Sequence, residues 1–230
     1  MGVEMVTDQL YRLLLGSFQS YLWREPHSVT LIDTGPADAA AEIAGALDEL
    51  GLAPADVDRV VLTHFHDDHT GSAAEIREWG TIQVIASAVD APVIRGVAER
   101  PAPNLAPDEV EPHARITSRL PAAPPVEVDL EVADGDVLDF GGGARVVATP
   151  GHTPGSLALY LPAHGVLFTG DTVAEHLGRV LLGAVNVDTS QAGESLRRLA
   201  GIPAGLAVFG HGEPVRTKAQ ARLQDAAAML

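Results

Sequence analysis

A dense cluster of potential metal ligands directly after the apolar run at residues 60–62 limits the folds that this chain can adopt. Residues 64–69 read HFHDDH, with three histidines and two aspartates in six positions. The preceding residues 57–62 (VDRVVL) are mostly apolar and are a candidate for a buried strand. The spacing differs from the i, i+4 histidine pair of a helical metal site. We therefore expect these side chains to spread from a loop at the carboxyl end of a strand, where open α/β sheets place their sites.

The segments on both sides of this cluster alternate between expected strands and helices. Residues 29–33 (VTLID) form a short apolar run that ends at a Gly-Pro turn, which indicates a buried strand. Residues 37–50 space their large apolar side chains three to four apart, as an amphipathic helix does. A helix over 72–79 and a strand over 82–86 follow. This alternation predicts α/β layering.

The second half of the chain has shorter apolar runs, several of them separated by Gly- or Pro-containing turns, which predicts an antiparallel meander. The expected strands are 126–132, 137–140, 144–149, 156–161 and 165–169, followed by a helix near 189–200, a strand at 206–209 and a helix over about 217–229. Residues 92–125 before them hold eight prolines. Such a segment predicts a long loop that acts as a lid, a binding loop or an interaction arm.

Three more potential ligands each follow an expected strand and adjoin a glycine. His152 stands in TPGHTPGS, Asp171 in LFTGDT and His211 in VFGHGEP. Glycine lets the backbone turn sharply and approach a metal closely. Each of these short motifs is weak by itself, and their joint presence with the HFHDDH cluster is what favours a metal site.

Taken together, the motifs resemble the metallo-β-lactamase-fold superfamily of hydrolases, from LIDTG at 31–35 to GHGEP at 210–214. The resemblance implies an α+β fold, the αββα four-layer sandwich, with two mixed β-sheets face to face and helices on the outer faces. It implies a single domain over residues 1–230, with a Pro-rich insertion or lid at about 92–125. The two halves, about 1–90 and 126–230, would each supply ligands.

The resemblance also implies a role for each potential ligand. His64, His66 and His152 look like ligands of a first metal, Asp68, His69 and His211 like ligands of a second, and Asp171 like a carboxylate that bridges the two. Two Zn²⁺ ions are expected, with Fe or Mn as alternatives. Such a pair would hold a bridging hydroxide that attacks the carbonyl of a small ester, lactone or thioester. Asp68 is also the candidate catalytic residue, in proton transfer.

The ligand set distinguishes between branches of the superfamily. True β-lactamases that this chain resembles lack the bridging aspartate, and several use a cysteine ligand, whereas this chain has Asp171 and no cysteine. The set looks more like that of glyoxalase II-type thioesterases and lactonases. Glyoxalase II enzymes carry a helical substrate domain after the last histidine, and few residues follow His211 here, so glutathione thioesters are expected to suit the site less well.

Two other functions remain open at this stage. Related sulfur dioxygenases hold one iron with two histidines and one aspartate on the same scaffold, so a mononuclear-iron oxidoreductase is the main alternative. Metal identity depends on ligand geometry and metal supply, which a sequence does not state. A non-catalytic binding module is the third possibility, and the complete ligand set disfavours it.

Composition excludes several partners. The chain has 15 basic and 31 acidic residues, a formal net charge of −16, which disfavours nucleic acid and an anionic membrane surface. The absence of cysteine excludes disulfides and thiolate chemistry. The first residues have no signal-peptide pattern, and no apolar run is long enough to span a membrane, so a cytoplasmic protein with a small-molecule substrate is expected. The sequence does not indicate an oligomeric state.

Several other residues have two interpretations. Asp33 either orients a ligand histidine or caps a turn, and Asp67 either supports the ligands or is a solvated loop carboxylate. Tyr21 and Tyr160 are expected to pack in the core rather than to act on substrate. His27 and His164 are expected at the surface. For His113 and His176, a position that faces a substrate stays open as the less favoured alternative.

Overall fold

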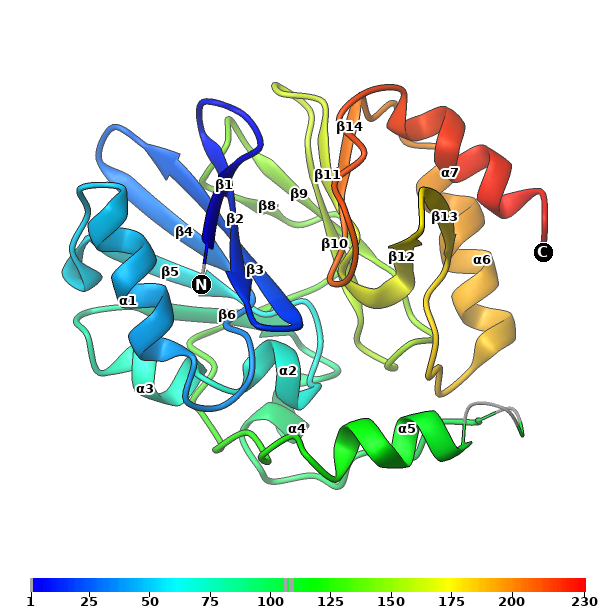
Figure 1. Ribbon diagram of the computed structural model, residues 1–230, viewed down its shortest axis with the longest axis horizontal. Helices are drawn as coiled ribbons and strands as arrows, with labels where there is room; N and C mark the ends of the chain where they lie inside the picture. Colours follow the sequence, from blue (N-terminus) through cyan, green and yellow to red (C-terminus); the bar gives the residue numbers. More distant parts are fainter. Residues whose placement is uncertain (1, 106, 108–109) are drawn as a thin grey trace. The chain divides into compact units, whose positions relative to one another are not determined.

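The structure is a computed structural model that describes residues 2–105, 107 and 110–230 (Figure 1). The chain divides into two compact units, and each is described by itself. Unit 1 comprises Met1–Glu99 and Arg115–Glu131, and unit 2 comprises Arg100–Ala114 and Val132–Leu230. The single domain expected over residues 1–230 stays a prediction.

Among the described residues, unit 1 is built on a seven-stranded mixed sheet whose strands follow one another in sequence order. The strands are β1 (Gly2–Met5), β2 (Leu10–Leu15), β3 (Phe18–Glu25), β4 (Ser28–Ile32), β5 (Val57–Val61), β6 (Gln83–Ser87) and β7 (Leu130–Val132). Strands β1 to β4 pair antiparallel, and β4, β5 and β6 pair parallel. The parallel part brings the carboxyl ends of β4 and β5 to one edge of the sheet, which positions the loops that follow them.

The helices of unit 1 cover an aliphatic core. They are α1 (Ala40–Glu49), the 3₁₀ turn η1 (Pro54–Asp56), α2 (Asp67–Thr70), α3 (Ala73–Arg77) and α4 (Ala91–Ile94), while α5 (Val110–Thr117) runs from one unit's residues into the other's. Helix α1 buries Ile43 and Leu47 completely against strand residues such as Leu31 and Val60. Burial of such a side chain stabilises the fold by about 1.5–3 kcal/mol.

Within the described part of unit 2, a five-stranded sheet has the order β14-β11-β10-β9-β8. Its strands are β8 (Val137–Leu138), β9 (Ala144–Ala148), β10 (Leu157–Leu161), β11 (Val166–Phe168) and β14 (Leu206–Val208). Strands β8 to β11 form the antiparallel meander that the turns predicted, and β14 joins β11 in parallel. A separate hairpin consists of β12 (Val173–His176) and β13 (Arg179–Leu182), preceded by the 3₁₀ turn η2 (Gly170–Thr172).

Two helices complete unit 2. Helix α6 (Thr189–Ala200) begins after Asp188, whose carboxylate accepts a hydrogen bond from the Gln191 amide as an N-cap. Its buried face and that of α7 (Ala219–Ala227) share a second aliphatic core, which includes Leu196 and Leu223. Asp188 thus fixes the start of α6, and its own amide donates a hydrogen bond to the Gly151 carbonyl.

The fold class expected from the sequence, α+β with two mixed sheets and helices, is confirmed. The expected strand over 126–132 is shorter, because regular pairing begins only at Leu130, after Pro124 and Pro125. The Pro-rich segment 92–125 contains most of α4 and all of α5, and three of its residues, 106, 108 and 109, lie outside the described residues. Its function as a lid or insertion stays a prediction.

One ion pair outside the site gives a pH-dependent contribution to stability. Arg77 in α3 donates to both carboxylate oxygens of Asp129, at 2.5 and 2.8 Å, and the Val84 amide donates to the same carboxylate. The hydrogen bond from Arg77 holds the pKa of Asp129 below its ordinary value of 3.8. The stabilisation is therefore present above pH 3.8 and is lost as the pH falls through the lower folded-state pKa.

We expect the Asp129→Asn variant to be about 0.5–1 kcal/mol less stable than wild type at pH 7, the range of a partly exposed ion pair. The difference should shrink at pH 2.5, which lies below the ordinary pKa of 3.8, because the unfolded chain then binds a proton at Asp129 that the folded ion pair resists. Urea unfolding at both pH values measures it. An equal difference at the two pH values would contradict an electrostatic origin.

Candidate metal centre

The first cluster of potential ligands lies where the sequence predicted, directly after strand β5. His64 follows the strand closely, and His66 is the N-cap residue of the short helix α2 with an extended backbone (φ −68°, ψ 150°). Asp68 and His69 lie on α2 itself. His64 and His69 are almost completely buried, whereas His66 and Asp68 are half-buried. A strand, one loop and one helical turn therefore place all four side chains in the same small region of unit 1.

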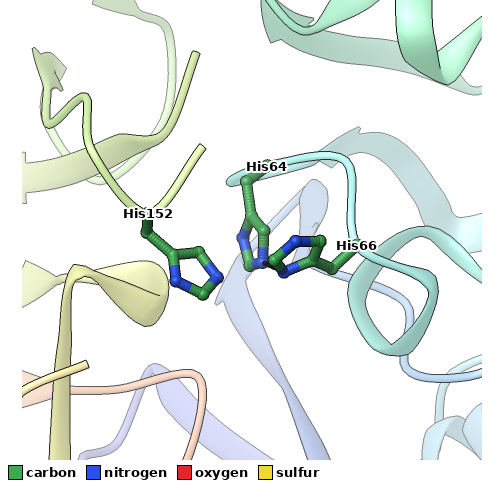
Figure 2. A group of neighbouring side chains, drawn as sticks. All are labelled: His64, His66 and His152. Atoms are coloured by element: carbon green, nitrogen blue, oxygen red, sulfur yellow. Dashed lines mark hydrogen bonds between the residues drawn. The ribbon is translucent and has the colours of Figure 1, made fainter. Parts of the chain in front are cut away.

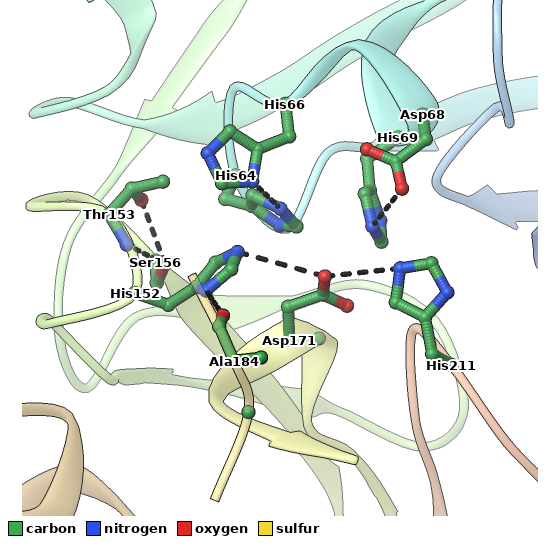
Figure 3. A network of polar contacts seen from close by, with 12 residues as sticks. His64, His66, Asp68, His69, His152, Thr153, Ser156, Asp171, Ala184 and His211 are labelled. Atoms are coloured by element: carbon green, nitrogen blue, oxygen red, sulfur yellow. Dashed lines mark hydrogen bonds and ion pairs between the residues drawn. The ribbon is translucent and has the colours of Figure 1, made fainter. Parts of the chain in front are cut away.

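Three short distances describe how these side chains converge. Nε2 of His64 lies 3.1 Å from Nδ1 of His66 (Figure 2). Nε2 of His69 lies 3.8 Å from Oδ2 of Asp68 (Figure 3). The ring centres of His64 and His69 are 4.1 Å apart. Imidazole nitrogens and a carboxylate oxygen at such separations are the donors that borderline divalent metals prefer.

Asp33 contacts this cluster through hydrogen bonds to Thr63 and His69. It follows β4 with a left-handed backbone (φ 61°), which aspartate adopts more readily than most residues. Its buried carboxylate accepts hydrogen bonds from the Thr63 amide and hydroxyl, both at 2.8 Å. Oδ2 of Asp33 also lies 2.8 Å from Nδ1 of His69. Of the two interpretations left open by the sequence, the contacts favour the orientation of a histidine, because Asp33 holds the His69 ring. That His69 is a metal ligand stays a prediction.

The same hydrogen bonds determine which imidazole nitrogens carry protons. An ionised carboxylate only accepts, so His69 Nδ1 and the Thr63 hydroxyl both donate to Asp33. The hydroxyl has one hydrogen, so its oxygen must accept from His64 Nδ1, which lies 2.9 Å away. Both imidazoles consequently keep their lone pair on Nε2. This is the tautomer that a metal ligand needs when its other ring nitrogen is held by a polar partner.

Two further aspartates fix the backbone of the cluster. Asp90, almost completely buried before α4, accepts a hydrogen bond from the Phe65 amide at 3.2 Å, between His64 and His66. Asp67 is half-buried and accepts a hydrogen bond from the Ala123 amide at 2.7 Å, so it connects the cluster to the Pro-rich segment. Asp67 is therefore a structural contact rather than a solvated loop carboxylate. The sequence analysis missed Asp90 and Thr63, since neither belongs to a recognisable motif.

The second cluster lies in unit 2. His152 follows β9, Asp171 lies in η2 directly after β11, and His211 follows β14. Oδ2 of Asp171 is 3.7 Å from Nε2 of His152 and 3.3 Å from Nε2 of His211 (Figure 3). One carboxylate oxygen thus lies near both imidazoles, as the sequence-based role of Asp171 requires.

The turn after β9 fixes His152 through backbone groups. His152 Nδ1 donates to the Ala184 carbonyl at 3.1 Å, which leaves the lone pair on the Nε2 that points toward Asp171 (Figure 3). The Val187 amide donates to the His152 carbonyl. Gly151 has φ +130°, and a Cβ atom there would lie 2.1 Å from the Ala192 nitrogen of α6, so only glycine fits. The sequence analysis missed Ala184, because a carbonyl partner has no side-chain signature.

The histidines and tyrosines discussed next belong to neither of the two clusters. His27, His164 and His176 are exposed, and His113 is half-buried on α5. Tyr21 is buried and accepts a hydrogen bond from Gln19, while Tyr160 contacts the core of unit 2. The expected core packing of the two tyrosines is confirmed, and so is the surface position of His27 and His164.

Comparison with known proteins adds the family. A family model described as the metallo-beta-lactamase superfamily matches residues 16–211, most of the chain. The chain belongs to this superfamily. The resemblance to this superfamily that the HFHDDH cluster and the three downstream motifs indicated is therefore confirmed. The family and the names of its relatives also confirm the expected enzyme class, a metal-dependent hydrolase, and imply the use of divalent metal.

Relatives within the superfamily differ in how much of their length they share with the chain. The chain is 29% identical over 237 residues to the "Probable metallo-hydrolase YflN" of Bacillus subtilis, covering 94% of this chain and 86% of that protein. It is 31% identical over 167 residues to a hydroxyacylglutathione hydrolase of Cereibacter sphaeroides, covering 71% of this chain and 50% of that protein. The chain thus spans about half the length of the latter relative.

Solved structures of the superfamily share the fold. A metallo-beta-lactamase family protein of Thermus thermophilus has a TM-score of 0.70 at 26% identity, covering 98% of this chain and 80% of that one. A metallo-β-lactamase of Cronobacter sakazakii reaches a TM-score of 0.77 at 22% identity, covering 100% and 91%. Among the described residues, no helix is both long and apolar enough to cross a membrane. The expected cytoplasmic location stays a prediction.

Proposed function

We propose that this superfamily member is a dinuclear-metal hydrolase that cleaves a small ester, lactone or thioester. The observation that carries the proposal is the hydrogen-bond chain from Asp33, which gives His64 and His69 the tautomer of metal ligands. Burying these polar groups costs free energy of desolvation. A loop without a ligand does not need its imidazoles held in one tautomer, whereas a metal site does.

The proposed ligands are the residues that the sequence motifs singled out. One ion takes His64, His66 and His152, the other takes Asp68, His69 and His211, and Asp171 is shared between them. Nitrogen and carboxylate donors without cysteine suit zinc, and they also suit iron or manganese. When bound, such ions lower the pKa of a water molecule toward neutrality and polarise the carbonyl of the substrate.

The residues of the chain would then act in distinct ways. The carboxylate of Asp33 orients His69 directly and His64 through Thr63. The Ala184 carbonyl orients His152. Asp68, half-buried at the edge of the cluster, is placed to take up and release a proton during attack on the carbonyl. Each of these groups is held before substrate arrives, which lowers the reorganisation that the reaction requires.

The substrate class rests on two observations. Several relatives carry the name hydroxyacylglutathione hydrolase, which supports the cleavage of an acyl bond. The net charge of −16 supports a small, weakly charged substrate and disfavours nucleic acid.

Elemental analysis and a substrate panel test the proposal together. Protein purified without added metal should contain about two zinc ions per chain and should hydrolyse at least one ester, lactone or thioester of a panel. If zinc-loaded protein turns over no member, the proposed substrate class is wrong. One iron per chain, with oxygen uptake in the presence of a persulfide, would instead favour the sulfur dioxygenase type of oxidoreductase.

A further inference from the structure

The position of His211 depends on an element of unit 2 that the sequence motifs do not include. His211 is 39% exposed, whereas His69 and His152 are 1% and 3% exposed and are packed on all sides. Packing therefore restrains the His211 ring much less than the other two. The position of the His211 imidazole therefore depends more on the backbone around His211. That backbone contacts the hairpin of β12 and β13.

Glu175 on β12 makes this contact at three points around His211. Its amide donates to the His211 carbonyl at 3.1 Å. One carboxylate oxygen, Oε2, accepts a hydrogen bond from the Glu213 amide at 2.6 Å. Between these two bonds lies Gly212 (φ +100°), where a Cβ atom would come within 2.1 Å of the Glu175 carbonyl oxygen. The turn that contains His211 thus packs in direct contact with Glu175.

The second carboxylate oxygen of Glu175 keeps the side chain in place. Oε1 accepts a hydrogen bond from the Gly178 amide at 2.5 Å, in the tight turn that joins β12 to β13. Leu177 and Gly178 in this turn both have positive φ, 50° and 80°. The side chain is buried, and both of its oxygens accept from backbone amides, so the carboxylate is held between two turns. A buried charge is costly unless it is satisfied in this way.

We infer that Glu175 is a positioning residue for His211, and hence for the ion that His211 is proposed to bind. The inference rests on the proposed function for the metal and on the contacts above for the positioning. The glutamate does not need to contact metal or substrate. It acts by holding the turn at 210–214, so that the imidazole of His211 stays near Oδ2 of Asp171.

The Glu175→Gln variant tests this inference, because it keeps the shape and removes one acceptor. An amide nitrogen cannot accept from a backbone N–H, so one of the two turns must lose its bond. We expect zinc titration in chelator buffer to give one ion bound about 10- to 100-fold more weakly, the size of effect known for groups that support a ligand. The other ion should bind as in wild type. The matched control is Glu194→Gln, on the exposed face of α6, which should bind both ions normally.

Two further measurements separate positioning from a general loss of structure. His211→Ala should weaken the same ion, and adding Glu175→Gln to it should cause little additional loss, since both changes act through one group. Amide hydrogen exchange of Glu213 in metal-free protein should be at least tenfold faster in Glu175→Ala, which removes both acceptor oxygens, than in wild type. Purely additive losses, an equal loss at both ions or unchanged Glu213 exchange would overturn the inference.

The same experiments distinguish failure of the inference from failure of the proposed function. A wild-type chain that takes up no ion contradicts the proposed function. The exchange of the Glu213 amide then decides the inference by itself, because it reports on the turn without metal. Faster exchange in Glu175→Ala supports the positioning of the turn by Glu175, and unchanged exchange rejects it.

Discussion

The Asp33→Asn variant is expected to bind metal about 10- to 100-fold more weakly than wild type while remaining folded. In wild type, Oδ2 of Asp33 lies 2.8 Å from both the Thr63 hydroxyl and His69 Nδ1. An asparagine that keeps its oxygen toward the Thr63 amide places an NH₂ group at this position. The NH₂ group donates, so His69 Nδ1 must accept and its proton moves to Nε2.

The change passes through Thr63 to His64 as well. A hydroxyl that accepts from the new NH₂ group donates its own hydrogen to His64 Nδ1, 2.9 Å away. His64 then also carries its proton on Nε2, so two proposed ligands lose their lone pairs at once. The variant keeps the shape of Asp33, and each of these polar groups still has a hydrogen-bond partner.

Zinc titration and circular dichroism of the two proteins measure this effect. NMR of the imidazole nitrogens in metal-free protein reports the tautomers of His64 and His69 directly. The matched control is Asp48→Asn on the exposed face of α1, which should behave as wild type. An Asp33→Asn protein with unchanged tautomers and normal zinc affinity would show that the carboxylate has no orienting function.

The Asp171→Ala variant is expected to lose about 10²–10³-fold or more in kcat/KM, the loss caused by removing one key electrostatic group from a site. Asp171 lies near both His152 and His211, at 3.7 and 3.3 Å, and is proposed to be shared by both ions. Its removal leaves less negative charge to offset two dications, so zinc content should fall below two per chain. His66→Ala should also lower metal content and activity sharply.

Neither variant should unfold, because Asp171 and His66 are half-buried and lie outside both aliphatic cores. Circular dichroism at room temperature should therefore match wild type, and Asp225→Ala on the exposed face of α7 is the matched control for the aspartate. Loss of the folded signal in Asp171→Ala would mean that the residue is needed for folding. Full activity and two zinc ions in this variant would contradict its proposed role.

Local patterns predicted much of the fold. The apolar runs that became β4, β5, β6, β9, β10 and β11 were visible, and so were the amphipathic pattern of α1 and the meander of unit 2. Strands β1 to β3 and the hairpin of β12 and β13 were not expected. In β12 the sequence VAEH has no run of branched apolar residues, and its pairing with β13 is decided by the turn at Leu177 and Gly178.

Local patterns also predicted every proposed metal ligand, because the HFHDDH cluster and the histidine or aspartate beside glycine at three later strand ends are short motifs along the chain. The groups that orient those ligands were much harder to find. Asp33 is 36 residues from His69, and Glu175 is 38 residues from Glu213. Ala184 acts through a carbonyl that any residue would supply. Nothing in a single sequence links such pairs.

Residue types and short spacings were enough to identify the family, the kinds of side chain proposed as metal ligands and the strands after which those side chains stand. Those features depend on residue identity and short spacing, which are properties of the chain alone. The folded structure was needed to identify which nitrogen of each imidazole keeps its lone pair and which residue holds the turn of His211. These features depend on hydrogen bonds between segments distant in sequence, and such bonds form only when the β-sheets bring those segments together.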